Sequence, residues 1–196
     1  MKAEALKFYG LDPQKKHLFI VGGSLGSRTL NEAMQKWITD GCPGGENIQV
    51  LWQCGRYYKA GVDAFMEQAK SEGKQGEGII HSDFIKRMDL AYAAADVVVT
   101  RSGASSISEL CAAHKASIFV PSPNVTEDHQ THNAMALVRK DAGMIVTDAD
   151  AAEKLMKTAC ELIENPEKIA LMEKNIAALA KTDAAMTIAE EVYKYV

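Results

Sequence analysis

The stretch Asp96-Val-Val-Val-Thr100 runs directly into Arg101-Ser-Gly-Ala-Ser-Ser-Ile-Ser-Glu109. A short run that is apolar on both faces and ends at a glycine turn is typical of a strand buried between two layers of helices. The hydroxyl-rich turn after it predicts the start of a helix, which we expect from about Ser105 to His114. The stretch is therefore one strand–turn–helix unit of an α/β fold.

The same unit recurs along the chain. Because each crossover must carry its helix across a face of the sheet, the alternation predicts a doubly wound, Rossmann-like parallel sheet. We expect a single domain over residues 1–196, since no linker or internal repeat interrupts it. Besides the opening unit, strands are predicted at His17–Val21, Ile48–Gln53, Gly78–His81, Ala116–Val120 and Gly143–Val146. Helices are predicted at Lys2–Tyr9, at Arg28–Thr39, at Tyr57–Glu72, after Phe84-Ile85 up to about Ala95, and at His129–Asp141. Two or three further helices are predicted between Asp150 and Val196, and Pro166 opens the second of them.

Composition excludes several classes of protein. The 196 residues are 47% hydrophobic and carry a net charge of −4, so the chain lacks the basic field that nucleic-acid binding needs. The four cysteines are scattered without a Cys-x-x-Cys pair, which favours reduced thiols over disulfides or a zinc site. No run approaches the roughly 20 apolar residues of a membrane span, and Met1–Gly10 lacks a signal-peptide core. We expect a cytoplasmic protein.

Five loops follow predicted strands and gather at one edge of the predicted sheet. In doubly wound sheets the ligand lies beyond the carboxyl ends of the strands, so these loops predict a ligand cleft. They are Gly22–Ser27, Gly55, Phe84–Met88, Arg101–Glu109 and Pro121–Asn133.

The first of these loops, Gly22-Gly-Ser-Leu-Gly-Ser27, joins a buried strand to a helix. Glycines let the backbone approach a ligand closely, and the helix N-terminus offers N–H groups to an anion. The spacing is not G-x-G-x-x-G and no Gly-Lys-Ser/Thr follows, so it matches neither the dinucleotide fingerprint nor the P-loop. The turn is either a tight connection capped by Ser24 or Ser27, or an anion site at Gly23, Ser24 and Gly26.

The segment Arg101–Glu109 repeats this arrangement, with hydroxyls at positions 102, 105, 106 and 108. Short hydroxyl donors and free N–H groups suit a pyrophosphate that is held without a P-loop lysine. Glu109 lies three residues after Ser106, so the pair has the spacing of a capping box. The functional alternative is that Glu109 accepts hydrogen bonds from the two ribose hydroxyls of a nucleotide.

A polar helix start, Asp128-His-Gln-Thr-His-Asn133, follows Pro121-x-Pro123. His129 and His132 are about one helical turn apart, which is a spacing that metal sites use. No third ligand or Asp-x-Asp run accompanies them, so we expect no metal and no cofactor, and interpret His129 and Gln130 as polar ligand contacts. The remaining histidines, interpreted as structural, are His17, His81 and His114.

Four of these motifs, in the same order, resemble the MurG family of bacterial transferases. They are Gly22-Gly-Ser-Leu-Gly-Ser-Arg-Thr-Leu-Asn31, Phe84-Ile85 with Met88, Ala95-Asp-Val-Val-Val-Thr-Arg-Ser-Gly-Ala104 with Ser108-Glu109, and Pro121-x-Pro with Asp128-His-Gln-Thr-x-Asn-Ala134. That family moves GlcNAc from UDP-GlcNAc onto undecaprenyl-pyrophosphoryl-MurNAc-pentapeptide (lipid I), which completes lipid II. The resemblance spans essentially the whole chain.

The resemblance implies that the chain is the C-terminal, donor-binding half of a two-domain GT-B transferase. The Ile85 backbone and Met88 would contact uracil, Glu109 the ribose, Ser24 and the Ala104–Ser106 amides the pyrophosphate, and His129 and Gln130 the GlcNAc. His129 departs from a glutamine of some members, and Ser27 from a common alanine. The full set of substrate-binding residues is then Gly23, Ser24, Gly26, Ile85, Met88, Arg101, Ser102, Gly103, Ala104, Ser105, Ser106, Glu109, His129, Gln130 and Asn133.

The resemblance also implies what lies outside the chain. The N-terminal half of the family carries the acceptor surface, the general base and most of the membrane contact, and the whole enzyme sits on the cytoplasmic face of the plasma membrane. We therefore expect no catalytic residue in this chain, weak UDP-GlcNAc binding, no metal requirement and no transfer by the chain alone.

Three other functions fit the residues. The first is the donor-binding subunit of a two-subunit dolichyl-pyrophosphate GlcNAc transferase, which is a natural single-domain chain. The second is a UDP-GlcNAc epimerase with a GT-B-like fold, and the third is a non-catalytic nucleotide-binding module.

Overall fold

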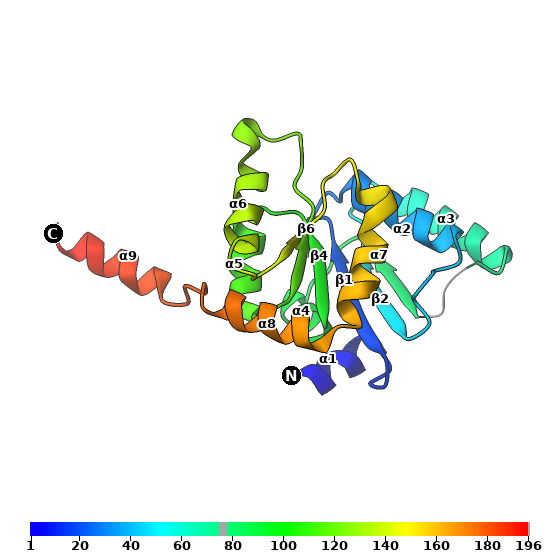
Figure 1. The fold of residues 1–196 in the computed structure, drawn as a ribbon, viewed down its shortest axis with the longest axis horizontal. Coiled ribbons are helices and arrows are strands. Elements are labelled where there is room, and N and C mark those ends of the chain that lie inside the picture. The colour runs from blue at the N-terminus through cyan, green and yellow to red at the C-terminus, as the bar shows by residue number, and fades with distance from the viewer. Residues whose placement is uncertain (75–77, 196) are drawn as a thin grey trace.

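The computed structural model describes residues 1–74 and 78–195. Strands and helices alternate along the chain as the periodicity predicts (Figure 1). The strands are β1 (Lys16–Val21), β2 (Ile48–Gln53), β3 (Ile79–Ser82), β4 (Val97–Thr100), β5 (Ser117–Phe119) and β6 (Met144–Ile145). The α-helices are α1 (Lys2–Tyr9), α2 (Arg28–Thr39), α3 (Lys59–Ser71), α4 (Met88–Ala94), α5 (Ala104–Ala113), α6 (His129–Val138), α7 (Ala151–Ile163), α8 (Pro166–Ala177) and α9 (Ala184–Tyr193).

The six strands form one parallel sheet in the order β3-β2-β1-β4-β5-β6. β1 is central, with Phe19 opposite Leu51 of β2 on one side and Val98 of β4 on the other. Strand order reverses on the two sides of β1, which is the arrangement of a doubly wound Rossmann-like sheet. The predicted fold class is confirmed.

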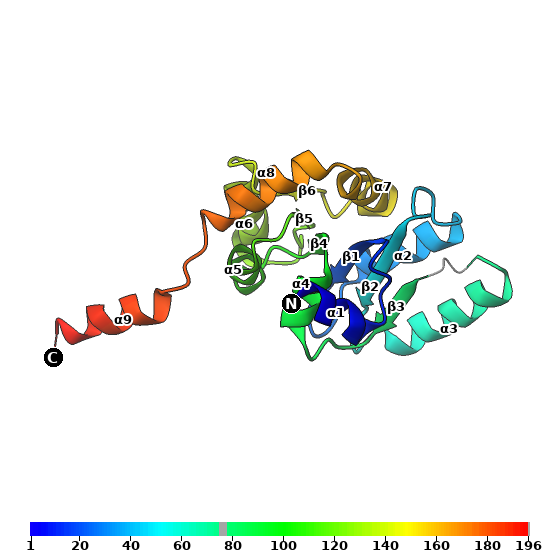
Figure 2. The same ribbon diagram turned by 90° about the horizontal axis from the view of Figure 1, so that it is seen from below.

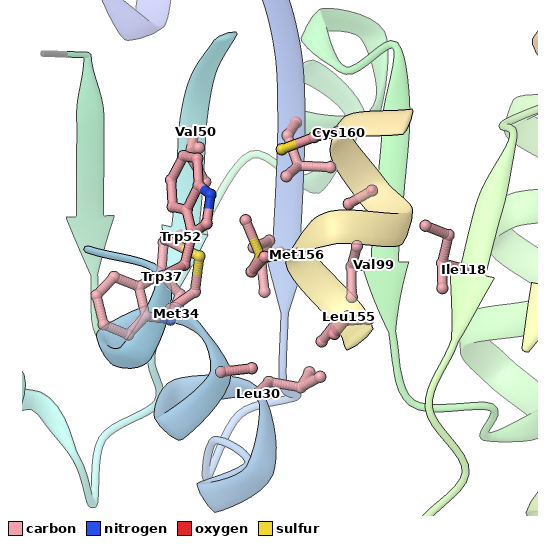
Figure 3. Packing of buried hydrophobic residues seen from close by; sticks show 14 of the residues in the cluster. Leu30, Met34, Trp37, Val50, Trp52, Val99, Ile118, Leu155, Met156 and Cys160 are labelled. Atoms are coloured by element: carbon pink, nitrogen blue, oxygen red, sulfur yellow. The ribbon is translucent and has the colours of Figure 1, made fainter. Parts of the chain in front are cut away.

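Alternate strand residues face two separate cores. Leu18, Val50 and Trp52 point toward α2, α3 and α7, where Figure 3 shows Trp52 near Met34 and Met156 near the centre of the cluster. Phe19 and its neighbours face α4, α5 and α6 on the opposite side. Burying both faces explains why the strands read as continuous apolar runs.

Helix ends follow local signals. Ser27 caps α2, with its Oγ accepting a hydrogen bond from the backbone N–H of Leu30, and Asn165 caps α8 one residue before Pro166. The predictions for α2 and β2 match at both ends. The predicted helices Tyr57–Glu72 and His129–Asp141 are shorter in the structure, since Gly55 and Tyr58 form a turn before α3 and α6 ends at Val138.

The last two helices differ in how they meet the sheet. α8 follows α7 and supplies Met172 to one core and Ile176 to the other. α1 packs beside α4, on the side away from α8 in Figure 2. α9 has no buried residue and projects away from the sheet (Figure 1). Two or three helices were predicted in this region, and the start of the second at Pro166 is confirmed. The prediction extends to Val196, which lies outside the described residues.

Asp96 holds the N-terminal edge of the sheet together. Its Oδ2 accepts a hydrogen bond from the backbone N–H of His17 at 2.9 Å, and its Oδ1 accepts one from Lys2 of α1. Burial alone would raise the pKa of Asp96, but the hydrogen bonds from His17 and Lys2 outweigh burial and hold that pKa below its usual value.

Asp96→Asn should therefore destabilise the protein by about 1 kcal/mol at pH 7, the scale of one net hydrogen bond. Because the folded pKa is depressed, the contribution is present above the unfolded pKa near 3.9 and is lost as pH falls toward the folded value. Urea unfolding at pH 7 and below pH 4 should show the two proteins converging in acid. Asp40→Asn, which removes an exposed i,i+4 partner of Lys36, is the control and should change little at either pH. A constant gap for Asp96→Asn at both pH values would contradict the assignment.

Candidate functional site

The loops that follow β1, β4 and β5 meet where the strand order reverses (Figure 1). The N-termini of α2 and α5 therefore lie at the same edge of the sheet, each directly after a neighbouring strand. This is the predicted place for a ligand crevice in a doubly wound sheet.

A polar cleft of about 540 Å³ opens at this edge. It brings together three predicted site residues, Gly26, Arg101 and Gln130. Sequence reasoning missed the other side chains, because they come from segments with no recognisable motif or from motif positions given no role. The cleft is lined by Gly22, Gly26, Ser27, Arg28, Thr29, Tyr58, Arg101, Ser122, Asn124, Gln130 and Asp148.

A second, mostly apolar groove of about 510 Å³ lies between α4 and α5. Met88 and Glu109, which were predicted to contact the base and the ribose, both line it, together with Tyr92. The nearby Ile85 side chain is buried in the core, so only its backbone remains for a ligand. Phe84, beside it, lies under the Arg56 guanidinium at 5.4 Å from the ring centroid.

The glycine turn after β1 presses directly against the loop after β2. A Cβ on Gly55 would lie 2.1 Å from the Gly26 Cα, and one on Gly26 would lie 2.2 Å from the Cys54 carbonyl oxygen. Both glycines also have left-handed backbones, with φ of +90° at Gly26 and +87° at Gly55. Gly23 and Ser24 are exposed at the tip of this turn. Ser27 takes the capping role predicted for one of the two serines.

Two buried amide side chains hold these loops in place through hydrogen bonds to their backbones. The Gln53 Nε2 donates hydrogen bonds to the carbonyls of Gly23 (2.8 Å) and Asp83 (3.0 Å), and its Oε1 accepts one from the Gly22 N–H. Asn31 at the start of α2 donates to the Cys54 carbonyl and accepts from the Trp52 indole, both at 2.9 Å. Sequence reasoning assigned neither residue a role, since their partners are distant in the chain.

The second turn leaves the start of α5 uncapped by any side chain. α5 begins at Ala104, and its N-cap is Gly103. The predicted Ser106–Glu109 capping box is wrong, because Ser106 lies inside the first turn rather than at its N-cap. The first-turn N–H groups, those of Ala104, Ser105 and Ser106, have no intrahelical acceptor and remain available.

Ser102 and Asn133 hold this turn against α6 instead of facing the cleft. Ser102 is fully buried, and its hydroxyl donates to the Gln130 carbonyl at 2.8 Å. The Asn133 amide donates to the Ser102 carbonyl at 3.1 Å. Gln130 accepts the Ser122 N–H at its Oε1, which leaves its Nε2 as a donor beside the cleft. Ser102 and Asn133, which were both predicted to bind the substrate, thus form hydrogen bonds within the fold.

Arg101 joins four segments of chain. One guanidinium nitrogen donates to the carbonyls of Val120 (3.0 Å) and Pro121 (3.2 Å) and to the Asp148 carboxylate, and the other donates to the Thr29 hydroxyl at 3.2 Å. Its positive charge is therefore largely balanced by Asp148, so it braces the cleft more than it attracts an anion.

His129 stands at the exposed start of α6. Its Nδ1 donates to the Thr126 carbonyl at 2.8 Å, which leaves Nε2 as the free ring nitrogen. The residues just before it, Glu127 and Asp128, adopt left-handed backbones with φ of +56° and +51°. Such strain in non-glycine residues is found preferentially at functional sites.

Residues 1–74 and 78–195 contain no group of three or more His, Cys, Asp or Glu side chains placed to hold a metal ion. Within the same residues, no helix has both the length and the apolar character needed to cross a bilayer.

Comparison with known proteins identifies the family. The profile of the glycosyltransferase family 28 C-terminal domain matches residues 17–188. The chain belongs to this family. The motifs that suggested the resemblance in the sequence lie within the matched residues.

Individual relatives agree with this family 28 assignment. The chain is 45% identical, over its whole length and 51% of the relative, to the UDP-N-acetylglucosamine--N-acetylmuramyl-(pentapeptide) pyrophosphoryl-undecaprenol N-acetylglucosamine transferase of Parabacteroides distasonis. It is 46% identical, over 98% of the chain and 50% of the relative, to the protein of that name from Bacteroides fragilis. The chain thus spans about half the length of the curated relatives that it matches. The crystal structure of MurG from Acinetobacter baumannii has the same fold, with a TM-score of 0.75 at 23% identity over 97% of this chain and 53% of that one.

Gly55→Ala should unfold the crevice edge, because the new Cβ would meet backbone atoms and the left-handed φ would be strained. We expect a loss of at least 2 kcal/mol in the free energy of unfolding, measured with urea. Gly61→Ala is the matched control. A Cβ there meets nothing within 4 Å, and in the α3 helix alanine should stabilise by roughly 0.5–1 kcal/mol. Equal effects of the two substitutions would show that the Gly26–Gly55 contact is unimportant.

Proposed function

We propose that residues 1–196 form one UDP-sugar-binding domain, the donor half of the inverting GlcNAc transferase that completes lipid II in peptidoglycan synthesis. Relatives with that transferase name, 45–46% identical over essentially the whole chain, support the choice of reaction. The chain's match to about half of each relative supports a role limited to one substrate.

The observation that carries the proposal is the pairing, on one helix, of an uncapped N-terminus with an exposed carboxylate. The N–H groups at Ala104–Ser106 offer a site for a diphosphate, since helix N-termini bind anions. Glu109 lies five residues after Ala104 in α5, which is about 7.5 Å along the helix axis at 1.5 Å per residue. A nucleoside diphosphate lying along the helix start can thus reach both groups, phosphate to amides and ribose to carboxylate.

The other subsites follow from the two cavities. The base lies against Met88 at the mouth of the α4–α5 groove and meets the Ile85 backbone. The sugar lies toward the polar cleft, and its hydroxyls bind the amide nitrogen of Gln130, which lines the cleft, and the ring of His129 at the start of α6. Ser24 and the glycine turn around Gly23 and Gly26 close over the diphosphate.

The mechanism is a single inverting displacement. A general base takes the proton of the acceptor's sugar hydroxyl as its oxygen attacks C1 of GlcNAc, the bond from C1 to the diphosphate oxygen breaks, and UDP leaves. Negative charge that develops on the leaving diphosphate is stabilised by the dipole and N–H groups at the start of α5, so the transfer needs no metal or cofactor.

The partners divide between this chain and the rest of the enzyme. UDP-GlcNAc binds here, whereas lipid I, the general base and the membrane contact belong to the half outside this chain, at the cytoplasmic face of the plasma membrane. Nucleic acid is not a partner. Donor binding by this chain alone is weak, because half of the cleft between the two domains lies outside this chain.

The three alternatives are less well supported. Both relatives named above are bacterial peptidoglycan-pathway transferases, which disfavours the dolichyl-linked enzyme and the epimerase. A non-catalytic nucleotide-binding module differs from the proposal in the ligand it accepts, and direct binding measurements distinguish them.

Calorimetry with UDP, UDP-GlcNAc and NAD tests the proposal. We expect both uridine nucleotides to bind and NAD not to bind, because the glycine turn lacks the dinucleotide spacing. The same chain should give no turnover of lipid I. Binding of NAD without UDP, or turnover by this chain alone, would contradict the proposal.

Glu109→Gln should weaken UDP binding by roughly tenfold to 100-fold, the range expected when a hydrogen bond to a charged group is lost. The loss should be smaller for 2′-deoxy-UDP, which lacks one of the two hydroxyls that Glu109 accepts from. Glu167→Gln, at an exposed position in the first turn of α8, is the matched control and should leave both affinities unchanged.

A further inference from the structure

The Glu109 carboxylate is held from the neighbouring helix by a tyrosine. The hydroxyl of Tyr92 in α4 donates a hydrogen bond to the Glu109 Oε2 at 2.9 Å. Tyr92 is 7% exposed, whereas Glu109 is exposed on α5. One end of the contact is therefore fixed in the core, and the other end reaches the surface that the proposed nucleoside occupies.

The core fixes the tyrosine ring itself. Tyr92 packs edge-to-face on Phe19 of the central strand, with ring centroids 5.9 Å apart. Burial, and then the hydrogen bond and negative charge of Glu109, raise the pKa of Tyr92 well above its usual value. The phenol thus stays protonated at physiological pH and can act only as the donor in this pair.

The hydrogen bond leaves Glu109 with capacity for a ligand. A carboxylate has about four lone-pair sites, and Tyr92 uses one of them on Oε2. Within the described residues no other group donates a hydrogen bond to this carboxylate, and both Tyr92 and Glu109 line the α4–α5 groove. A glutamate on an exposed helix face otherwise samples many rotamers, and ordering it on binding costs affinity.

We propose that Tyr92 is a positioning residue that locks the Glu109 carboxylate in the orientation which accepts the ribose 2′ and 3′ hydroxyls, and so makes the site selective for ribonucleotides over 2′-deoxyribonucleotides. This assignment rests on the proposed function, in which Glu109 receives the ribose. It adds Tyr92 to the site as a second residue of α4, besides Met88.

Tyr92→Phe tests the assignment, because it removes the hydroxyl and keeps the ring in its core position. UDP binding should weaken roughly threefold to tenfold, which is less than for Glu109→Gln because the carboxylate itself remains. Binding of 2′-deoxy-UDP should weaken less, so the affinity ratio of the two ligands should shrink. Calorimetry with both ligands measures the ratio directly.

Tyr9→Phe is the matched control, since it removes a tyrosine hydroxyl that bonds the nearby Arg87 carbonyl and does not contact Glu109. It should leave the ratio at the wild-type value. In a double-mutant cycle, adding Tyr92→Phe to Glu109→Gln should weaken UDP binding no further, because Tyr92 acts through that carboxylate. Thermal unfolding of each variant separates any general loss of stability from the change in ratio.

The outcomes separate this assignment from the proposed function. If the wild-type chain binds UDP and prefers it to 2′-deoxy-UDP, but Tyr92→Phe keeps the same ratio, the positioning role is overturned and the function stands. If the wild-type chain binds both ligands equally, Glu109 does not receive the ribose, and the assignment is overturned while uridine nucleotide binding remains. If the wild-type chain binds no UDP, the proposed function and this assignment are both overturned.

Discussion

The central position of β1 is the constraint on which the rest of the structure depends. Because β1 pairs with β2 on one side and β4 on the other, the chain places β2 and β3 on one side of β1 and then β4, β5 and β6 on the other, and the helices that follow β1 and β4 begin beside each other. Two helix N-termini at one edge give a crevice rich in unpaired N–H groups. The hydrophobic pattern that buries both faces of the sheet thus also determines where an anion can bind.

Topology brings the loops together, but buried polar side chains determine their shape. Gln53 binds the turns after β1 and β3, Asn31 ties α2 to the end of β2, and Ser102 joins the turn after β4 to α6. A buried amide or hydroxyl left unpaired costs about 1–3 kcal/mol, so each of these groups strongly favours the one loop arrangement that satisfies it. The close packing of Gly26 on Gly55 adds a steric limit in the same place.

The strands and most helices could be predicted because their signal is local. Apolar runs and glycine turns predicted every strand, and the motif order predicted the family. The roles of Ser102, Asn133 and Arg101 could not be predicted in this way, since each bonds to a segment at least 19 residues away. The capping box failed for a related reason: spacing alone does not say at which residue a helix starts. The exposure of α9 depends on tertiary packing, which its own sequence does not encode.

The electrostatics of the crevice combine backbone groups with two arginines. Arg101 is paired with Asp148, whereas Arg28, which also lines the cleft, is exposed and forms no ion pair within residues 1–74 and 78–195. Each helix N-terminus carries roughly half a positive charge, but its effect falls off within the first turn. Stabilisation of a diphosphate therefore depends on the ligand lying within hydrogen-bond reach of the Ala104–Ser106 amides. The shape of the loops, together with the charge of Arg28, consequently decides how well this edge of the sheet can hold a nucleotide.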